Sequence, residues 1–340
     1  MMPSPFFIIG TERSGTTLLR LILNTHSRLA VPEEVGYFGF DFSQTIDVTQ
    51  WENPGLSWEE YEQYVHNFLS SRKETFKDFE LQDLEDTILK NKEINLKKPY
   101  QTSLSQFARL HGKQRWGEKT PNNVFFVDIL YQMFPKAKFI HIVRDPRSIV
   151  CSMNQDDFPW FSDDSVINAL NWRKKFQAAK QLLEKNVPSE QRMLIRYEDL
   201  VANPEVSVKQ ICSFLNEAFE PDMLQFYRTS KEFMLKSANN SHNRMANNPI
   251  STESLKRWEK NLKASDIFGI DSICRKELKK LGYTSDLGKA DIIQHFLIWF
   301  KQIYWYWHSW LHRSTRGYVM QHKVFILERL KHRRFRLSDT

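Results

Sequence analysis

The sequence lacks the features that mark disulfide-rich, zinc-binding and membrane-anchored proteins. Its three cysteines, Cys151, Cys212 and Cys274, are widely spaced and form no CxxC pair. Such spacing indicates neither a zinc site nor a disulfide framework, and it favours a reducing compartment. The first ten residues have no basic region, and their apolar run is too short for a signal peptide or an anchor. We therefore expect a cytoplasmic protein.

Excess charge of one sign is also missing from most of the chain. The formal net charge is +7, but residues 291–340 alone carry nine basic against three acidic side chains. The remaining body is nearly neutral, which argues against a nucleic-acid partner. With 340 residues and 41% hydrophobic content, the chain can bury the core of one large domain with extensions.

The stretch GTERSGTT, residues 10–17, has the outline of a phosphate-binding loop but lacks the usual lysine, since Thr16 occupies its place. Gly10 and Gly15 permit a tight path, and Arg13 supplies a cation within the turn. Enzymes that act on triphosphates use the missing lysine on the β and γ phosphates. The loop therefore favours a 5′ phosphate with a different leaving group and no metal. The alternative is an ordinary strand-to-helix turn with an incidental arginine.

Apolar runs alternate with amphipathic segments along the chain. Residues 5–10, 137–143 and 192–197 are predicted to form buried parallel strands, each followed by a helix. We predict an α/β fold, a P-loop-type three-layer sandwich with a mostly parallel central sheet. Residues 1–285 would form the main domain, with 51–110 as a helical insertion that caps the carboxyl edge of the sheet. Residues 286–340 would form a basic, aromatic helical tail.

A second motif, VRDPRSIVCSM, begins at the end of a predicted strand. Arg144 leaves that strand, and Ser152 follows two helical turns into the next element. Both side chains can converge on a second, separate phosphate.

At this point the chain resembles the sulfotransferases that use 3′-phosphoadenosine 5′-phosphosulfate (PAPS). The resemblance covers roughly Pro5 to Tyr283 and is greatest to the branch of protein-tyrosine and many bacterial sulfotransferases. Five motifs stand in the family's order: GTERSGTTLL, GEKTPNN, VRDPRSIVCSM, IRYEDLVANP and LKRW followed by LGY. The cytosolic small-molecule branch would have a catalytic histidine after its Lys–Thr pair, where this chain has Pro121.

The resemblance implies a donor and a set of site residues. PAPS would be the co-substrate, with no metal. Its 5′-phosphosulfate would be bound by the loop residues Arg13, Ser14, Gly15, Thr16 and Thr17, and its 3′ phosphate by Arg144 and Ser152. Arg13 and Lys119 would stabilise charge in the transition state. Glu34, 21 residues after Arg13, would be the catalytic base, with Glu33 as the alternative. A solvated loop is the plainer interpretation of both glutamates.

Three further residues have two interpretations each. Tyr197 resembles the family tyrosine near the 3′ side of the nucleotide but could simply be a core residue. Lys256 and Arg257 lie where the family has a segment that closes over the nucleotide, and they could equally belong to an exposed helix with Trp258 packed inward.

The tail is predicted to be a helix with Ile293, Phe296, Phe300, Ile303, Trp307 and Trp310 at helical spacing. Lys301 interrupts any span long enough to cross a bilayer. Basic residues follow, among them Lys323, Arg329, Lys331, Arg333, Arg334 and Arg336. This pattern suits an anionic membrane surface on the cytoplasmic side. Packing on the body or a dimer contact is the alternative.

The predicted function is transfer of a sulfuryl group to an acceptor hydroxyl or amine. Tyrosine, a sugar, a lipid headgroup and a small molecule all remain open as acceptors. The alternatives are a non-catalytic nucleotide-binding or membrane-associated scaffold and a small-molecule phosphotransferase.

Overall fold

The computed structural model describes residues 3–38, 48–77, 79–155, 161–228, 248–285 and 292–311. The chain divides into two compact units. The first comprises Met1–Val143 and Ala178–Ser251, and the second comprises Arg144–Gln177 and Thr252–Thr340. Each unit therefore combines two separate stretches of chain. No change in composition along the sequence predicts this division.

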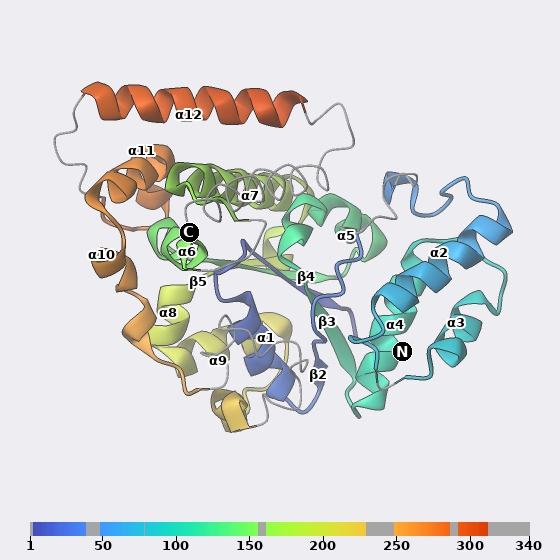
Figure 1. The fold of residues 1–340 in the computed structure, drawn as a ribbon. Coiled ribbons are helices and arrows are strands. Elements are labelled where there is room, and N and C mark those ends of the chain that lie inside the picture. Colours follow the sequence, from blue (N-terminus) through green and yellow to red (C-terminus); the bar gives the residue numbers. More distant parts are fainter. Residues whose placement is uncertain are drawn as a thin grey trace, which may run out of the picture. The chain divides into compact units, whose positions relative to one another are not determined.

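A five-stranded parallel sheet lies at the centre of the first unit (Figure 1). Its order is β2-β3-β1-β4-β5. The strands are β1 (Phe6–Ile9), β2 (Leu29–Ala30), β3 (Arg115–Lys119), β4 (Lys138–Val143) and β5 (Arg192–Arg196). The parallel pairing and the helices between strands confirm the predicted α/β class. Every residue of β1 is buried, as expected of a central parallel strand.

Helices cover both faces of this sheet. In Figure 1, α1 (Thr16–Thr25), α8 (Tyr197–Ala202) and α9 (Pro204–Leu215) lie on one side, and α5 (Val127–Met133) lies on the other. Short 3₁₀ turns complete the connections: η3 (Pro121–Phe125), η4 (Ser189–Gln191) and η5 (Pro221–Arg228). His141 is buried within β4, and burial lowers its pKa to about 4, so it is a neutral, packed histidine.

Where the structure describes them, residues 51–110 are mostly helical. They contain α2 (Trp58–Ser71), α3 (Leu81–Leu89) and α4 (Lys97–Leu110), preceded by η2 (Val48–Gln50). Ser57 and Glu60 form a reciprocal capping box that starts α2. α4 packs on β2 and β3, and the ring of Tyr100 stacks on Tyr37 with centroids 4.5 Å apart. The insertion thus shares one hydrophobic core with the sheet.

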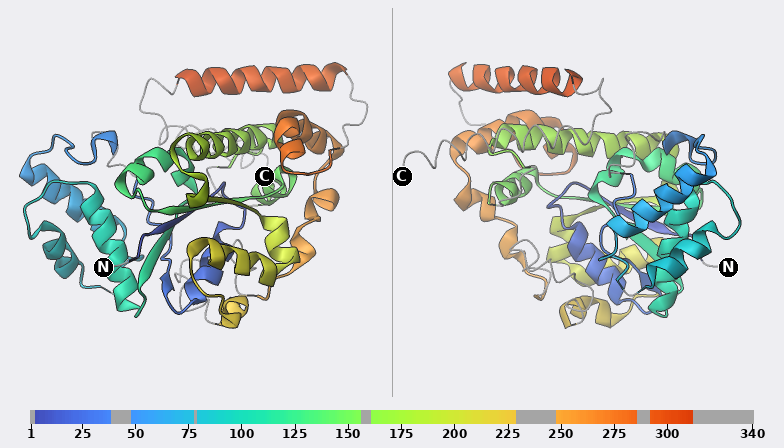
Figure 2. Two further views of the ribbon diagram at one scale, coloured as in Figure 1. Left: turned by 180° about the vertical axis from the view of Figure 1, so that it is seen from behind. Right: turned by 45° about the vertical axis from the view of Figure 1, so that its right-hand side comes forward.

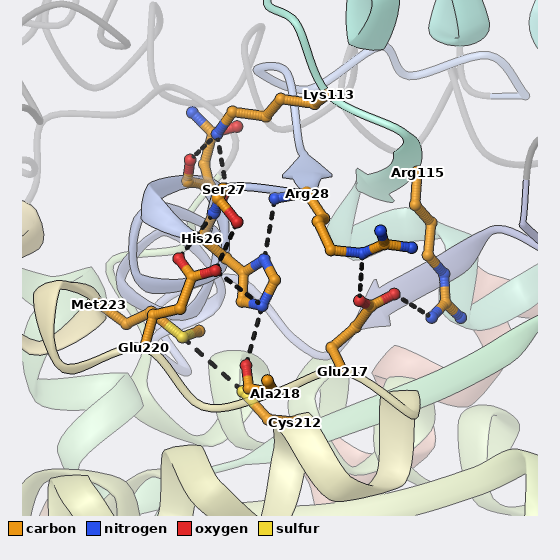
Figure 3. Close-up of polar contacts among 11 residues, drawn as sticks. His26, Ser27, Arg28, Lys113, Arg115, Cys212, Glu217, Ala218, Glu220 and Met223 are labelled. Carbon is orange, nitrogen blue, oxygen red and sulfur yellow. Dashed lines mark hydrogen bonds and ion pairs between the residues drawn. The ribbon is translucent and has the colours of Figure 1, made fainter.

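A polar cluster holds the carboxyl end of α1 to the chain that follows α9 (Figure 3). Nδ1 of the buried His26 accepts from the Arg28 N–H at 3.0 Å, and Nε2 therefore donates to the Ala218 carbonyl at 2.9 Å. Glu220 accepts from the Ser27 N–H at 2.8 Å. Burial acts to raise the pKa of Glu220, but the hydrogen bonds from Ser27 and the nearby Lys113 charge together lower that pKa. Because α1 carries the glycine loop at its other end, this cluster fixes the helix that positions the loop.

The second unit is helical in its described part. It contains α6 (Pro146–Asn154), the first part of α7 (Ser165–Asn186), η9 (Thr252–Ser254), α10 (Arg257–Asn261), α11 (Ala264–Lys280) and α12 (Ile292–Leu311). The helix predicted to follow the strand at 137–143 is confirmed and begins at Pro146. Asp145 caps it, since its carboxylate accepts from the Arg147 N–H at 2.8 Å.

α12 is the helix predicted in the tail, and it runs beside α7 and α11 (Figures 1 and 2). Its packed side includes Ile298 and Trp305, whose indole N–H donates to Asn171 at 3.0 Å. The predicted stripe lies on the opposite side: Ile293, Phe296, Phe300, Ile303 and Trp307 are each between 46% and 64% exposed. Within the described ranges, no helix is long and apolar enough to cross a membrane. The predicted basic residues from Lys323 to Arg336 and the side chain of Trp310 lie outside the described residues.

Candidate active site

The glycine loop joins the end of β1 to the start of α1, as predicted. Gly15 has a φ of +95°, in the region that favours glycine. A Cβ at Gly15 would collide with the ring of Tyr197, and a Cβ at Gly10 would collide with the Ile142 carbonyl. Both glycines are therefore needed for this path. Tyr197 is the first residue of α8, not the end of a strand, and its ring supports the loop.

The loop delivers the amino end of α1 to the carboxyl edge of the sheet. Thr16 opens α1, and Arg13 precedes it with a φ of 67°. The hydroxyl of the buried Ser14 donates to the Thr11 carbonyl at 2.5 Å, and the Ser14 N–H donates to the same oxygen at 3.2 Å. Ser14 thus shapes the turn, while the N–H groups that open a helix suit an anion.

Lys119 ends β3, the strand next to β1. In the sheet register it pairs with Ile8, two residues before the loop begins. Its side chain is 4% exposed, and its ammonium nitrogen lies 2.5 Å from the Glu34 carboxylate oxygen Oε1. A buried cation and an acidic residue therefore meet at the carboxyl end of β3, beside the strand that leads into the loop.

The two candidate glutamates have different partners. Glu33 lies 3.6 Å from Arg20 of α1, whose side chain is 2% exposed. Glu34 pairs with Lys119, and its side chain is 51% exposed. Burial lowers the pKa of Arg20, while Glu33 and Glu34 act to raise it. Glu33 is thus tied to the helix, whereas Glu34 is both paired with a cation and open to solvent.

A buried acid beside this pair, Glu118, was not predicted from the sequence. The Glu118 carboxylate accepts hydrogen bonds from Thr120 and from Asn123, the latter at 2.6 Å. Burial raises the pKa of Glu118 to about 7 against the lowering effect of the Thr120 hydrogen bond. Thr120 Oγ1 also accepts the N–H of Gly36 at 3.0 Å. The motif GEKTPNN contained this acid, but no spacing in the sequence linked it to Gly36.

The second motif has its own set of contacts in the second unit. Arg144 donates to the Ser254 carbonyl at 3.1 Å, and Ser148 donates to the Leu255 carbonyl at 3.2 Å. These bonds hold the chain directly before Lys256 and Arg257, where α10 begins. The half-buried Ser152 lies on α6.

Cys151 lies on α6 between Arg144 and Ser152 in the sequence. Burial raises the pKa of the Cys151 thiol, while a hydrogen bond from Asn261 and the positive charges of Arg144 and Arg257 act in the opposite direction. Through its bond to Ser254, Arg144 lies against the chain that leads to Arg257, although the two arginines are more than a hundred residues apart in the sequence.

Arg147 organises the same region and was not predicted. Its guanidinium binds the Asp145 carboxylate at 2.7 Å and lies 4.1 Å from the centroid of the Trp258 ring. It is also 3.7 Å from Asp271 of α11. Trp258 therefore packs against α6 through a cation–π contact, consistent with the inward orientation considered from the sequence. The neighbouring Lys256 and Arg257 are both exposed.

The fold and these sites define a class of protein, an α/β nucleotide-binding protein of the P-loop type. Residues 5–221 match the model of the sulfotransferase family. The chain therefore belongs to the sulfotransferase family. This confirms the resemblance read from its motifs, and with it an enzyme that transfers a sulfuryl group from PAPS.

Curated relatives and solved structures agree with this assignment. Protein-tyrosine sulfotransferase A of Caenorhabditis elegans is 23% identical over 294 residues, which cover 82% of this chain and 67% of that protein. Omega-hydroxy-beta-dihydromenaquinone-9 sulfotransferase Stf3 of Mycobacterium bovis is 26% identical over 136 residues, 35% of this chain and 34% of that protein. The sulfotransferase domain from the curacin biosynthetic pathway has the same fold, with a TM-score of 0.58 and 23% identity over 84% of this chain and 99% of that domain.

Proposed function

We propose that Glu34 is the catalytic base and that Lys119 and Arg13 stabilise the leaving group. The observation that carries this assignment is the Lys119–Glu34 pair at the strand edge next to the glycine loop. Glu34 removes the proton of the acceptor hydroxyl, whose oxygen attacks the sulfur of PAPS. The bond between sulfur and the bridging oxygen breaks, and adenosine 3′,5′-bisphosphate leaves with the electron pair.

The ion pair couples these two events. In the resting site, the Lys119 ammonium is bound to the Glu34 carboxylate. When Glu34 takes the acceptor proton, its negative charge disappears and it no longer attracts the ammonium. Lys119 is then available for the bridging oxygen at the moment when negative charge develops there.

The donor is bound in two places. The loop residues Arg13 to Thr17 bind the 5′ phosphate, with Tyr197 supporting them from behind Gly15. Arg144 and Ser152 bind the 3′ phosphate, and Lys256 and Arg257 add positive charge. The support for this second group is that Arg144 binds the Ser254 carbonyl, directly before the segment that carries Lys256 and Arg257.

This assignment predicts strong selectivity for the 3′ phosphate. Adenosine 3′,5′-bisphosphate should bind at least about a hundredfold more tightly than AMP, because a bidentate arginine–phosphate contact and its neighbouring charges are lost with the 3′ group. Isothermal titration with both nucleotides measures the ratio. In Arg144→Ala the two affinities should approach each other, whereas Arg109→Ala, an exposed arginine on α4, should keep the selectivity of the unmodified chain. Equal affinities in the unmodified chain would refute the assignment.

The acceptor is proposed to carry a hydroxyl group. Two relatives are named for hydroxyl acceptors that are otherwise unlike each other, a protein tyrosine and an omega-hydroxy menaquinone. Glu34, whose side chain is half exposed, can receive a proton from either kind of hydroxyl.

We also propose that the aromatic stripe of α12 binds an anionic membrane surface. Large apolar side chains occupy one side of the helix, while Ile298 and Trp305 hold its other side on the second unit. Aromatic side chains are favoured at the membrane interface. Eight of the nine basic residues in 291–340 would add about 1 kcal/mol each near anionic lipid, whereas Lys301 is paired with Asp164 on the packed side.

Two substitutions in the stripe test this proposal. The full chain with Phe300→Glu and Trp307→Glu should lose most of its co-sedimentation with phosphatidylserine-containing vesicles and keep its melting temperature, since both residues are exposed. Val206→Glu, at an equally exposed apolar position on α9, is the matched control and should bind vesicles normally. Unchanged vesicle binding by the double variant would exclude the membrane assignment, and a lower melting temperature would indicate a packing role instead.

A further inference from the structure

The chain that carries Glu34 has no helix or strand of its own between β2 and residue 38. It is held instead by side chains from other elements. Asn24 of α1 accepts the Val31 N–H at 2.9 Å, and Thr120 accepts the Gly36 N–H at 3.0 Å. Tyr37 donates to the Leu96 carbonyl at the start of α4. The position of Glu34 therefore depends on residues that are distant in sequence.

Arg72 is the cation among these supports, and it comes from the helical insertion. It follows α2 directly, and 7% of it is exposed. Its Nε donates to the Val35 carbonyl, and Nη2 lies 3.4 Å from the Gly36 carbonyl. Nη1 donates to the Ser71 carbonyl at 3.0 Å, which ties the guanidinium to the end of its own helix. One side chain thus joins α2 to the two residues that follow Glu34.

Arg72 and Glu34 also interact through their charges. Burial lowers the pKa of Arg72 to about 10, and the Glu34 carboxylate is the charge that acts against this. A buried arginine whose nitrogens are bound to backbone carbonyls has little freedom to move. The planar guanidinium holds its N–H donors in fixed directions and also carries a charge, whereas a lysine would supply only the charge.

We infer that Arg72 is a positioning residue for catalysis, through which the helical insertion sets the orientation of Glu34 toward the acceptor. Arg72 touches neither donor nor acceptor in this account and acts only through the backbone and the charge of the Glu34 segment. The insertion would then be part of the catalytic apparatus as well as part of the core. The inference rests on the proposal that Glu34 is the base.

A double-mutant cycle between Arg72 and Glu34 tests the inference. Arg72→Gln should lower kcat by at least about tenfold, because small displacements of a base are costly, and should change the affinity for adenosine 3′,5′-bisphosphate by less than about twofold. In a Glu34→Gln background, Arg72→Gln should cause no further loss. Arg72→Lys should recover part of the activity, since it keeps the charge but not the fork. If the two substitutions lowered kcat independently, so that their fold losses multiplied in the double variant, the inference would be overturned.

Two control variants separate positioning from general destabilisation. Ser57→Ala removes the capping box of α2, so it should lower the melting temperature and leave kcat unchanged. Arg109→Gln makes the same chemical change at an exposed position of the insertion and should alter neither quantity. If Ser57→Ala lowered kcat as much as Arg72→Gln, the role of Arg72 would be structural only. Full activity of Glu34→Gln would instead refute the assignment of the base.

Discussion

Replacing Lys119 with alanine is expected to lower turnover by about a hundredfold or more. The lysine is asked to stabilise charge on the leaving oxygen, a contribution of about 3 kcal/mol in the transition state. Arg13→Ala should have an effect of the same size for the same reason. Steady-state kcat at saturating donor measures both effects, with nucleotide affinity measured separately by titration.

The control for these variants is Lys136→Ala, which removes an exposed lysine before β4 and should leave kcat unchanged. Lys119 needs this comparison because its removal also takes the partner of Glu34 away. Glu34 is half exposed, so water can solvate its carboxylate and the fold should survive the substitution. A kcat for Lys119→Ala within twofold of that of the unmodified enzyme would rule out its role in catalysis.

Glu34→Gln is expected to lower turnover on the order of a hundredfold, since general base catalysis contributes that much or more. The amide keeps the shape of the side chain but cannot take the acceptor proton, so nucleotide affinity should stay nearly the same. Glu33→Gln should retain most of the activity, because Glu33 lies beside Arg20 of α1 and not beside Lys119. The kcat values of the two variants should therefore differ widely.

The opposite result has a clear meaning. If Glu33→Gln were inactive and Glu34→Gln active, the base would be Glu33 and the Lys119–Glu34 pair would serve only to hold the strand edge. If both variants kept full activity, a group other than Glu33 and Glu34 would take the proton.

The strands predicted from apolar runs are present: β1, β4 and β5 fall within the predicted residues 5–10, 137–143 and 192–197. β1 is fully buried as predicted, but β5 lies at the edge of the sheet and is buried only at Ile195. The bounds of β3 could not be predicted from an apolar run because its sequence, RWGEK, contains three charged residues, yet all five of its residues are buried. Arg115 reaches Glu217 at 3.2 Å and Lys119 reaches Glu34 at 2.5 Å, so two of these charges are compensated by partners far along the chain. Glu118 is compensated locally, by hydrogen bonds from Thr120 and Asn123. No local pattern contains the two distant pairings.

The candidate site was predictable to the extent that short motifs determine local geometry. The glycine spacing gave the loop, and the motif order gave the family, which the match over residues 5–221 confirmed. The contacts of the Glu34 segment were not predictable, because Lys119 and Thr120 approach it from the end of β3 and Arg72 from the end of α2. The resemblance selected Glu34 because it follows Arg13 by 21 residues in the sequence. The structure adds that Glu34 pairs with Lys119, whereas its neighbour Glu33 lies beside Arg20.

In the tail, helical periodicity predicted the helix but not its packing. Helical spacing predicted α12 and its stripe, and Ile293, Phe296 and Phe300 do share an exposed side. The sequence left packing and surface binding as alternatives, but the helix has a packed side and an exposed one. Trp305, which lies outside the predicted stripe, supplies the contact with Asn171 that orients the helix.

The most direct test of the account is transfer of radiolabelled sulfur from PAPS to a pool of hydroxyl-bearing acceptors, followed over a single turnover by the unmodified enzyme and by Glu34→Gln. We expect label to move to an acceptor and adenosine 3′,5′-bisphosphate to be released in equal amount. Glu34→Gln should bind the donor but transfer label on the order of a hundredfold more slowly. Label that leaves the donor only as free sulfate in the presence of every acceptor, or equal transfer rates for the two proteins, would contradict it.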